Sequence, residues 1–258
     1  MPASRPVAIA VLSAVAACTP SQFAWDDARD TGLARYRRSF ADACGTRFDA
    51  ALDADGFTAM ALRTRLLWLG DYHTDGDQHA RMAALLERLQ RGPRGLALAL
   101  ESIATEDEPL VASFLAGERS LASLRERVRL RWPGSWLDDP ALDPDFYCWL
   151  LLFAREHRLP VVALEGVPRP PLEARDAAIA ARVQAFAAAE PDRLVVAIVG
   201  QAHLVGEGAL LARCSLPQVV VGGVPPEALA AAAPAAPSEG TFLRSDGGLW
   251  WFADALRR

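Results

Sequence analysis

The amino-acid sequence predicts an α/β fold: a mostly parallel sheet with helices on both faces and an antiparallel hairpin at the C-terminal edge. The first observation is composition, since 52% of the 258 residues are hydrophobic and 23% are charged, as in globular chains with a sizeable core. The second is a set of short apolar runs, and the third is the helical segments that alternate with them. Continuous apolar strands separated by amphipathic helices indicate parallel strands covered on both faces.

The elements alternate along the chain. Residues 21–63 are a polar lead-in with helical pieces around ARYRRSFADAC. We expect five apolar runs to form strands: residues 65–70, 95–101, 161–165, 193–200 and 218–223. Amphipathic stretches between them, such as GDQHARMAALLERLQRG and DPDFYCWLLLFAREHRLP, predict the covering helices.

The C-terminal tail has a different pattern. GTFLRSDGGLWWFA predicts two strands around an Asp-Gly-Gly turn, which we interpret as an antiparallel hairpin at the sheet edge. Residues 227–240 are low in complexity, and we expect a mobile loop there. Because the sequence has no internal repeat and no obvious linker, we expect residues 19–258 to form a single domain.

Residues 1–18 resemble a lipoprotein-type signal peptide. Arg5 precedes an apolar segment from Val7 to Val15, which is too short to span a bilayer. VAAC, which ends at Cys18, resembles the lipobox of bacterial lipoproteins, in which the cysteine is lipidated. We therefore expect an exported, periplasmic or outer-membrane lipoprotein anchored to the membrane at Cys18. An ordinary secretory signal cleaved near Ala17 is the alternative.

Charge and cysteine content narrow the possible partners. The net charge is −5 and there is no basic stripe, so we expect no nucleic-acid partner. Export would place the remaining cysteines, Cys44, Cys148 and Cys214, in an oxidising compartment. A disulfide between Cys44 and Cys214 and a set of buried free thiols both fit this number of cysteines.

Acids and histidines follow the first four predicted strands. The first strand ends in Asp71 and His73, the second in Glu101, the third in Glu165, and the fourth in a second Gly-x-x-His motif at His203. Ligands of an open parallel sheet bind outside the carboxyl ends of the strands, so these side chains should converge on one site. Either histidine taken alone could equally be a structural residue.

Other polar residues lie near these strand ends. His79 is too far from His73 to share a helix face as in His-Glu-x-x-His, and should lie in the first turn of the next helix, facing either the site or solvent. His157, near a helix C-terminus, is predicted to be a surface residue. Arg175 and Asp176 begin a helix and could pair with the acids of the site.

These motifs resemble the ChaN-like haem-binding uptake family, within the superfamily of Tiki/TraB proteins and erythromycin esterases. The resemblance covers about residues 65–205 and rests on LGDYHTDGDQH, LALES, VASFLAGE, WPGSW…FYCWLLLFAREHRLPVVALE, EARDAAIAARV and VVAIVGQAHL. The family's usual first motif is Gly-Glu-x-His, and here Asp71 stands in place of the glutamate. Its carboxylate is withdrawn by one methylene, which puts a metal-ligand role for Asp71 in doubt.

The ChaN-like branch implies an exported lipoprotein that binds haem or iron and takes part in iron uptake. In that branch haem is held between the subunits of a homodimer, and a tyrosine is implicated as the iron ligand. Tyr72 and Tyr147 are the candidate ligands here, and His79 is a further candidate for contact with the cofactor.

The related branches imply a metal-dependent hydrolase, protease-like or esterase-like, as the alternative. In that alternative His73, Glu101 and His203, with Asp71, would hold a divalent metal such as zinc, manganese or iron. The bound water would attack the substrate, with Glu165 or Asp71 as general base. A metal-free variant would use His73 as base and Glu101 as its orienting partner. A scaffold with a degenerate site is the third possibility.

Overall fold

The computed structural model describes residues 31–206, 208–233 and 240–257. The predicted signal peptide, with Cys18, lies outside these ranges, as do residues 234–239 of the predicted loop. Within the described ranges, no helix has both the length and the apolar character that crossing a membrane requires.

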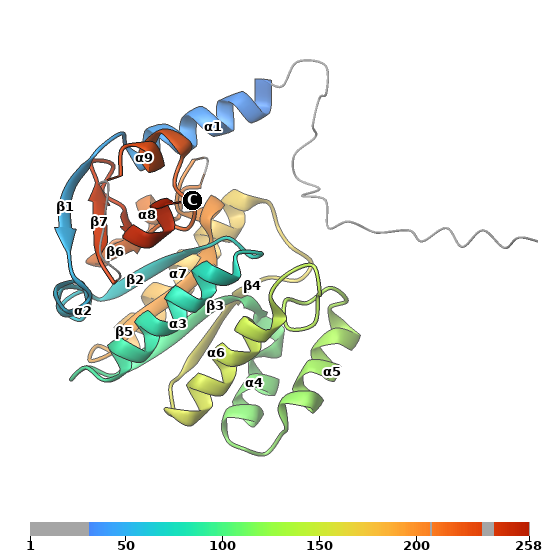
Figure 1. Cartoon of the computed structure of the whole chain (residues 1–258). Helices are drawn as coiled ribbons and strands as arrows, with labels where there is room; N and C mark the ends of the chain where they lie inside the picture. The colour runs from blue at the N-terminus through green and yellow to red at the C-terminus, as the bar shows by residue number, and fades with distance from the viewer. Residues whose placement is uncertain (1–30, 207, 234–239, 258) are drawn as a thin grey trace, which may run out of the picture.

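Eight strands form one mixed sheet in the order β1-β7-β8-β6-β2-β5-β3-β4 (Figure 1). The five strands predicted from apolar runs are present and parallel to one another: β2 (Leu66–Asp71), β3 (Leu96–Ala104), β4 (Val161–Glu165), β5 (Leu194–Gly200) and β6 (Gln218–Val221). The predicted α/β class is therefore confirmed.

The sheet differs from the prediction at its other end. β7 (Phe242–Ser245) and β8 (Trp250–Phe252) form the predicted antiparallel hairpin, but this hairpin is not the edge of the sheet. β1 (Phe48–Leu52) pairs with the outer side of β7, and β8 pairs in parallel with β6. The lead-in of residues 21–63 contains the helix predicted around ARYRRSFADAC, α1 (Thr31–Cys44), but also β1, which was not predicted. FDAAL alternates between half-buried and exposed positions and contains no continuous apolar run.

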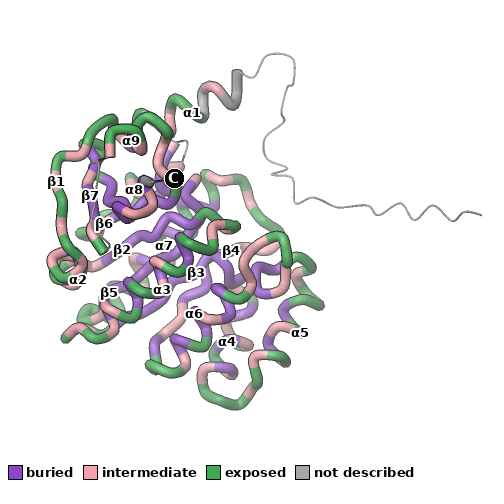
Figure 2. The backbone as a smooth tube through the Cα atoms, viewed as in Figure 1, coloured by how far each residue is buried: buried purple, intermediate pink, exposed green. Residues whose placement is uncertain are grey.

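Helices cover both faces of the sheet (Figures 1 and 2). The first face carries α3 (Gly76–Gln90), α4 (Glu108–Leu115), α5 (Leu121–Arg131) and α6 (Pro144–Glu156). The second face carries α7 (Leu172–Ala189), α8 (Leu210–Arg213) and α9 (Glu227–Ala231). The remaining helices are α1 (Thr31–Cys44), α2 (Ala54–Ala61) and the short 3-10 helices η1 (Thr105–Asp107), η2 (Gln201–His203) and η3 (Ala253–Arg257). Because α9 forms within residues 227–240, the loop predicted there is helical in part.

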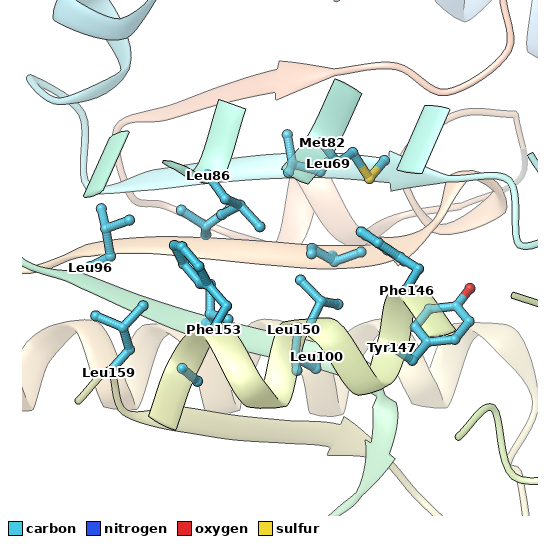
Figure 3. Packing of buried hydrophobic residues seen from close by; sticks show 14 of the residues in the cluster. Leu69, Met82, Leu86, Leu96, Leu100, Phe146, Tyr147, Leu150, Phe153 and Leu159 are labelled. Atoms are coloured by element: carbon cyan, nitrogen blue, oxygen red, sulfur yellow. The ribbon is translucent and has the colours of Figure 1, made fainter. Parts of the chain in front are cut away.

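Successive side chains of each central strand enter two different cores, as the two-residue period of a strand requires. Leu67 and Leu69 of β2 belong to the core that contains α3 and α6, whereas Leu66 and Trp68 belong to the core that contains α7. Figure 3 shows the first of these cores, with Leu150 of α6 among its members. Burial on both faces explains why these strands are apolar throughout.

The free edge of the sheet at β4 is covered by side chains. The backbone N–H of Ala163 donates to Glu108 Oε1 at 3.2 Å, and Arg182 Nε donates to the carbonyl of Ala163 at 2.7 Å. Glu108 and Arg182 also form an ion pair with each other. The peptide groups of this edge residue are therefore satisfied without another strand.

The cysteines of the described chain are buried and free. Cys44, Cys148 and Cys214 form no disulfide, so of the two alternatives the structure shows the buried free thiols and not the Cys44–Cys214 bridge. Burial raises the pKa of the Cys44 thiol to about 12, which keeps it protonated and unreactive at neutral pH.

Leu150 should contribute strongly to stability because its side chain is fully buried in the first core. We expect Leu150→Ala to lower the free energy of unfolding by about 2–5 kcal/mol, through lost apolar burial and the cavity left behind. Leu130→Ala is the matched control, since Leu130 is 73% exposed and its loss should change stability by about 0.5 kcal/mol or less. Urea denaturation measures both, and equal effects would contradict this description of the core.

Candidate functional site

The predicted site residues lie at one edge of the sheet. The order β2-β5-β3-β4 makes neighbours of the C-terminal parts of the strands, which carry Asp71, Gly200, Glu101 and Glu165. β3 continues past the predicted end at Glu101 to Ala104. Asp71, Glu101, Glu165 and His203 are all buried. Because a buried charge is costly unless it is paired, the partners of these groups define the site.

Asp71 is the centre of a first network. Its Oδ2 accepts hydrogen bonds from the Tyr147 hydroxyl at 2.7 Å and from His73 Nδ1 at 3.0 Å, and its Oδ1 lies 2.8 Å from His79 Nε2. Burial raises the pKa of Asp71, but hydrogen bonds from His73 and His79 outweigh it and lower the pKa below its usual value. The ionised carboxylate therefore holds three side chains in place.

His79 lies in the first turn of α3, as predicted, and is buried. Its Nδ1 is 2.8 Å from Asp143 Oδ2, and its ring stacks on Phe146 with centroids 4.1 Å apart. Burial lowers the pKa of His79, but Asp71 and Asp143 together raise it above its usual value. Carboxylates contact both ring nitrogens, so the role of His79 is to hold Asp71 in position. The predicted contact of His79 with a cofactor would require a free nitrogen, which the ring does not have in this arrangement.

His73 is more accessible, with 32% of its side chain exposed. Its Nδ1 donates to Asp71, and its ring packs against Trp136 with centroids 4.1 Å apart. The opposite side of the ring faces Gly200: a Cβ at Gly200 would lie 3.2 Å from His73 Nε2 and 3.4 Å from Glu101 Oε2. A glycine here therefore keeps open the space between His73 and Glu101.

Glu101 is the centre of a second network. Its Oε2 accepts the backbone N–H of Gly200 at 2.6 Å, while its Oε1 contacts Arg175 and lies 3.3 Å from His203 Nε2. Regular pairing of β3 with β5 ends at Leu100. Beyond this point the N–H of Gly200 donates to the Glu101 carboxylate and not to a backbone carbonyl of β3. Burial raises the pKa of Glu101, but His203 and Arg175 hold it well below its usual value.

His203 lies between two carboxylates. Its Nδ1 contacts Asp176 Oδ1 and its Nε2 faces Glu101, while Asp176 Oδ2 accepts the backbone N–H of Ala209 at 2.7 Å. Burial lowers the pKa of His203, but the charge of Glu101 and the hydrogen bond to Asp176 raise it to about 9. At neutral pH the ring is therefore a buried imidazolium that donates on both sides.

Two arginines complete the site. Arg175 Nη2 bridges Glu101 and Glu165, at 2.8 Å from Glu165 Oε2. Arg169 Nε lies 2.9 Å from the same Glu165 oxygen, and its guanidinium lies over the Trp136 ring at 5.3 Å. Burial and the charge of Glu101 raise the pKa of Glu165 despite both arginines. The sequence suggested the contact of Arg175 but not that of Arg169, which lies in an irregular Pro-rich loop without a recognisable motif.

The four predicted metal ligands do not form one group. Asp71 and His73 belong to the first network, whereas Glu101 and His203 belong to the second. Within the described part of the chain, no cluster of three or more His, Cys, Asp or Glu side chains is arranged to hold a metal. Glu101 is already paired with the positive charge of Arg175. The orienting partner of His73 is Asp71 and not Glu101, which corrects the metal-free variant.

The two candidate iron-ligating tyrosines have opposite environments. Tyr147 is fully buried and donates its hydroxyl to Asp71; burial and the Asp71 charge raise the pKa of Tyr147 far above its usual value. It therefore stays a protonated phenol and is unavailable to iron in this arrangement. Tyr72, in contrast, follows β2 directly and is 54% exposed.

The state of His203 predicts a loss of stability at alkaline pH. Its pKa of about 9 lies above the ordinary value of 6.5, so its proton stabilises the folded chain fully below about pH 6.5 and this contribution disappears as the pH rises through about 9. Between these values we expect the free energy of unfolding to fall by about 1–3 kcal/mol. His203→Gln should flatten this dependence in thermal melts recorded from pH 6 to 10. Parallel curves for both proteins would show that another group is responsible.

Comparisons with known proteins bear on this site. The family described as haem-binding uptake, Tiki superfamily, ChaN matches residues 57–170. A comparison with curated proteins finds no match. Among solved structures, the type III effector HopBA1 is 16% identical with a TM-score of 0.45, over 69% of this chain and 86% of that one. ChaN of Campylobacter jejuni, described with cofacial haem binding, is 9% identical with a TM-score of 0.44, over 67% and 89%.

A third similar structure is RRSP, a MARTX toxin effector domain from Vibrio vulnificus CMCP6, with 18% identity and a TM-score of 0.46. The match covers 88% of this chain but only 44% of that one. The family match contains Asp71, Tyr72, His73 and Glu101, and ends before Arg175 and His203. Over residues 57–170 the chain thus matches the haem-binding uptake family ChaN of the Tiki superfamily, and the predicted resemblance is confirmed.

Proposed function

We propose that this protein binds haem at the carboxyl edge of its sheet, with Tyr72 as the iron ligand. The observation that carries the proposal is the exposed Tyr72 phenol, which lies beside the buried networks inside the segment that matches a haem-binding family. A haem site requires an axial ligand, such as tyrosine or histidine, and an apolar surface against the ring. Bound haem would make the protein a carrier of iron.

The surroundings of Tyr72 fit such a ligand. Its backbone N–H donates to Gln78 Oε1 at 2.9 Å and its carbonyl accepts the N–H of Asp75 at 2.7 Å, so the loop that presents the phenol is fixed. An apolar side chain, Val224, is exposed in the loop after the neighbouring strand β6. His73 is next in sequence, and no hydrogen bond engages its Nε2 among the described residues. A phenol on a hydrogen-bonded loop and an available imidazole are therefore adjacent in the chain, and an exposed apolar side chain follows the neighbouring strand.

Export, iron uptake and pairing of subunits are further parts of the proposal. The lipobox-like VAAC ending at Cys18 supports attachment to a membrane through lipid, in the periplasm or at the outer membrane. The family match supports a role in haem or iron uptake. A homodimer with haem between its subunits is proposed from the resemblance alone.

A hemin titration followed by absorbance tests this function. We expect a saturable Soret band, and expect Tyr72→Phe to weaken binding at this site by about tenfold or more, since the mutant lacks the phenolate oxygen. Tyr147→Phe is the matched control, because this buried hydroxyl contacts Asp71 and should leave the Soret band unchanged. A Soret band that is identical in wild type and Tyr72→Phe would remove Tyr72 as the ligand.

A second candidate function, hydrolysis without a metal, is favoured by the Asp71–His73 pair. The ionised Asp71 fixes the proton on His73 Nδ1, which leaves Nε2 as the acceptor nitrogen facing the space above Gly200. A histidine oriented in this way is a general base that can take a proton from water, while the carboxylate stabilises the imidazolium that forms. On the other side of the space above Gly200, two positively charged side chains, His203 and Arg175, contact Glu101.

An ester substrate such as p-nitrophenyl acetate distinguishes the two functions. If hydrolysis occurs at this site, we expect His73→Ala to lower kcat/KM about 100-fold or more, and Asp71→Asn to lower it as well. Tyr72→Phe should leave the rate unchanged. Treatment with a chelator tests the metal-dependent alternative, since only that version would lose activity. Activity that survives in His73→Ala would exclude His73 as the base.

A further inference from the structure

Arg169 is an exposed cation at the carboxyl edge of the sheet, and neither function proposed above uses it. It lies in the loop GVPRPP, residues 166–171, between β4 and α7. Proline fixes its own φ and restricts the residue before it, so the three prolines of this loop leave it few conformations. The Arg169 side chain is 37% exposed, compared with 9% for Arg175. A ligand that enters the site therefore reaches the Arg169 guanidinium before the buried charges.

Two kinds of contact hold this guanidinium beside His73. Arg169 Nε forms an ion pair with Glu165 Oε2 at 2.9 Å. The guanidinium also lies over two indole rings, at 5.3 Å from the centroid of Trp136 and 5.6 Å from that of Trp132. His73 packs against the same Trp136 ring, with centroids 4.1 Å apart. The two accessible polar groups, His73 and Arg169, therefore border one indole ring.

This part of the site has more N–H donors than acceptors. The four carboxylate oxygens of Glu101 and Glu165 already accept hydrogen bonds from the chain. Arg175 Nε is buried and has no hydrogen-bond partner within the described chain. Among the described residues no hydrogen bond engages the Nη groups of Arg169, because its ion pair with Glu165 is made by Nε. The accessible Nη groups are thus left for acceptor oxygens of a ligand.

The charges of this network cancel. Each of three carboxylates lies against at least one of three cations; the carboxylates are Glu101, Glu165 and Asp176, and the cations are Arg169, Arg175 and His203. An anion that approaches Arg169 therefore meets no net negative charge from the network. A guanidinium presents several N–H groups in a fixed plane, so its Nη edge can bind a carboxylate or a phosphate while Nε keeps its own partner.

We propose that Arg169 forms an oxyanion subsite, which holds a carboxylate or phosphate substituent of a ligand bound beside His73. Glu165, Trp136 and Trp132 hold the guanidinium in position, and its Nη groups donate to the anion. The inference goes beyond the proposed function, because neither iron nor the Tyr72 phenol takes part in it.

Benzoate and phenyl phosphate are suitable probes of the full chain, with benzamide as the uncharged match for benzoate. The sequence has four histidines, so NMR of the imidazole nitrogens can follow His73, whose signals are assigned with His73→Gln. At constant ionic strength we expect both anions to shift the His73 signals saturably, and benzamide to bind about tenfold more weakly or less. The signals of His157, at the C-terminal end of α6, should not move.

Variants of the ion pair separate anion binding from a purely structural role. Arg169→Gln should weaken binding of both anions by about tenfold or more, and Arg169→Lys should restore part of it. Glu165→Gln should instead strengthen binding about threefold or more, because it removes the charge that neutralises Arg169. If Arg169 served only as the partner of Glu165, both glutamine variants would change binding in the same direction. Melting temperatures check that each variant folds.

Arg127→Gln is the matched control, because Arg127 is exposed on α5, away from the ion pair of Arg169 with Glu165. It should leave anion binding unchanged, and so should Tyr72→Phe, which separates this subsite from the proposed haem ligand. Tighter binding of benzoate than of phenyl phosphate would identify the substituent as a carboxylate, and the reverse order as a phosphate.

Three results would overturn the subsite: equal binding of benzoate and benzamide, anion binding that is unchanged in Arg169→Gln, and His73 signals that neither anion shifts. Each would leave the hemin titration and the role of Tyr72 as they are.

Discussion

The buried carboxylate of Glu101 is the interaction on which the rest of the site depends. It accepts the backbone N–H of Gly200 on β5 and contacts Arg175 of α7 and His203 of η2, so that three elements meet on one side chain. Removing one partner of such a buried ionic group typically costs about 3–5 kcal/mol, because the other charges are left uncompensated. The positions of the side chains at this edge therefore depend on charge pairing as well as on the strand order. Arg175 also donates to Glu165 and holds that carboxylate in place.

The central fold could be predicted because each parallel strand is buried on both faces and is therefore a continuous apolar run. β1 could not be predicted in this way, since FDAAL alternates between half-buried and exposed positions and receives its partner from β7, far away in the chain. The hairpin of β7 and β8 was recognisable from its turn, but its place inside the sheet depends on pairings with β1 and β6 that no local pattern encodes.

The site could be predicted at the level of residues but not of partners. Strand ends identified Asp71, Glu101, Glu165 and His203, because parallel strands bring their carboxyl ends to one edge. Which side chain pairs with which depends on distances across the sheet and on rotamers. Tyr147 therefore turned out to be a hydrogen-bond donor to Asp71, although the resemblance had suggested an iron ligand. No sequence motif identified Asp143 as the second partner of His79, because the two residues are 64 positions apart in the chain.

The capped edge at β4 has a consequence for association between copies of the chain. With the peptide groups of Ala163 already bonded to Glu108 and Arg182, a second copy gains little by continuing the sheet across this edge, and would first have to separate an ion pair. At the β4 edge, growth of the sheet from chain to chain, a common route to aggregation, is thereby opposed by two side chains. A chain that met this edge would therefore contact the charged side chains of α4 and α7 and not an open row of peptide groups.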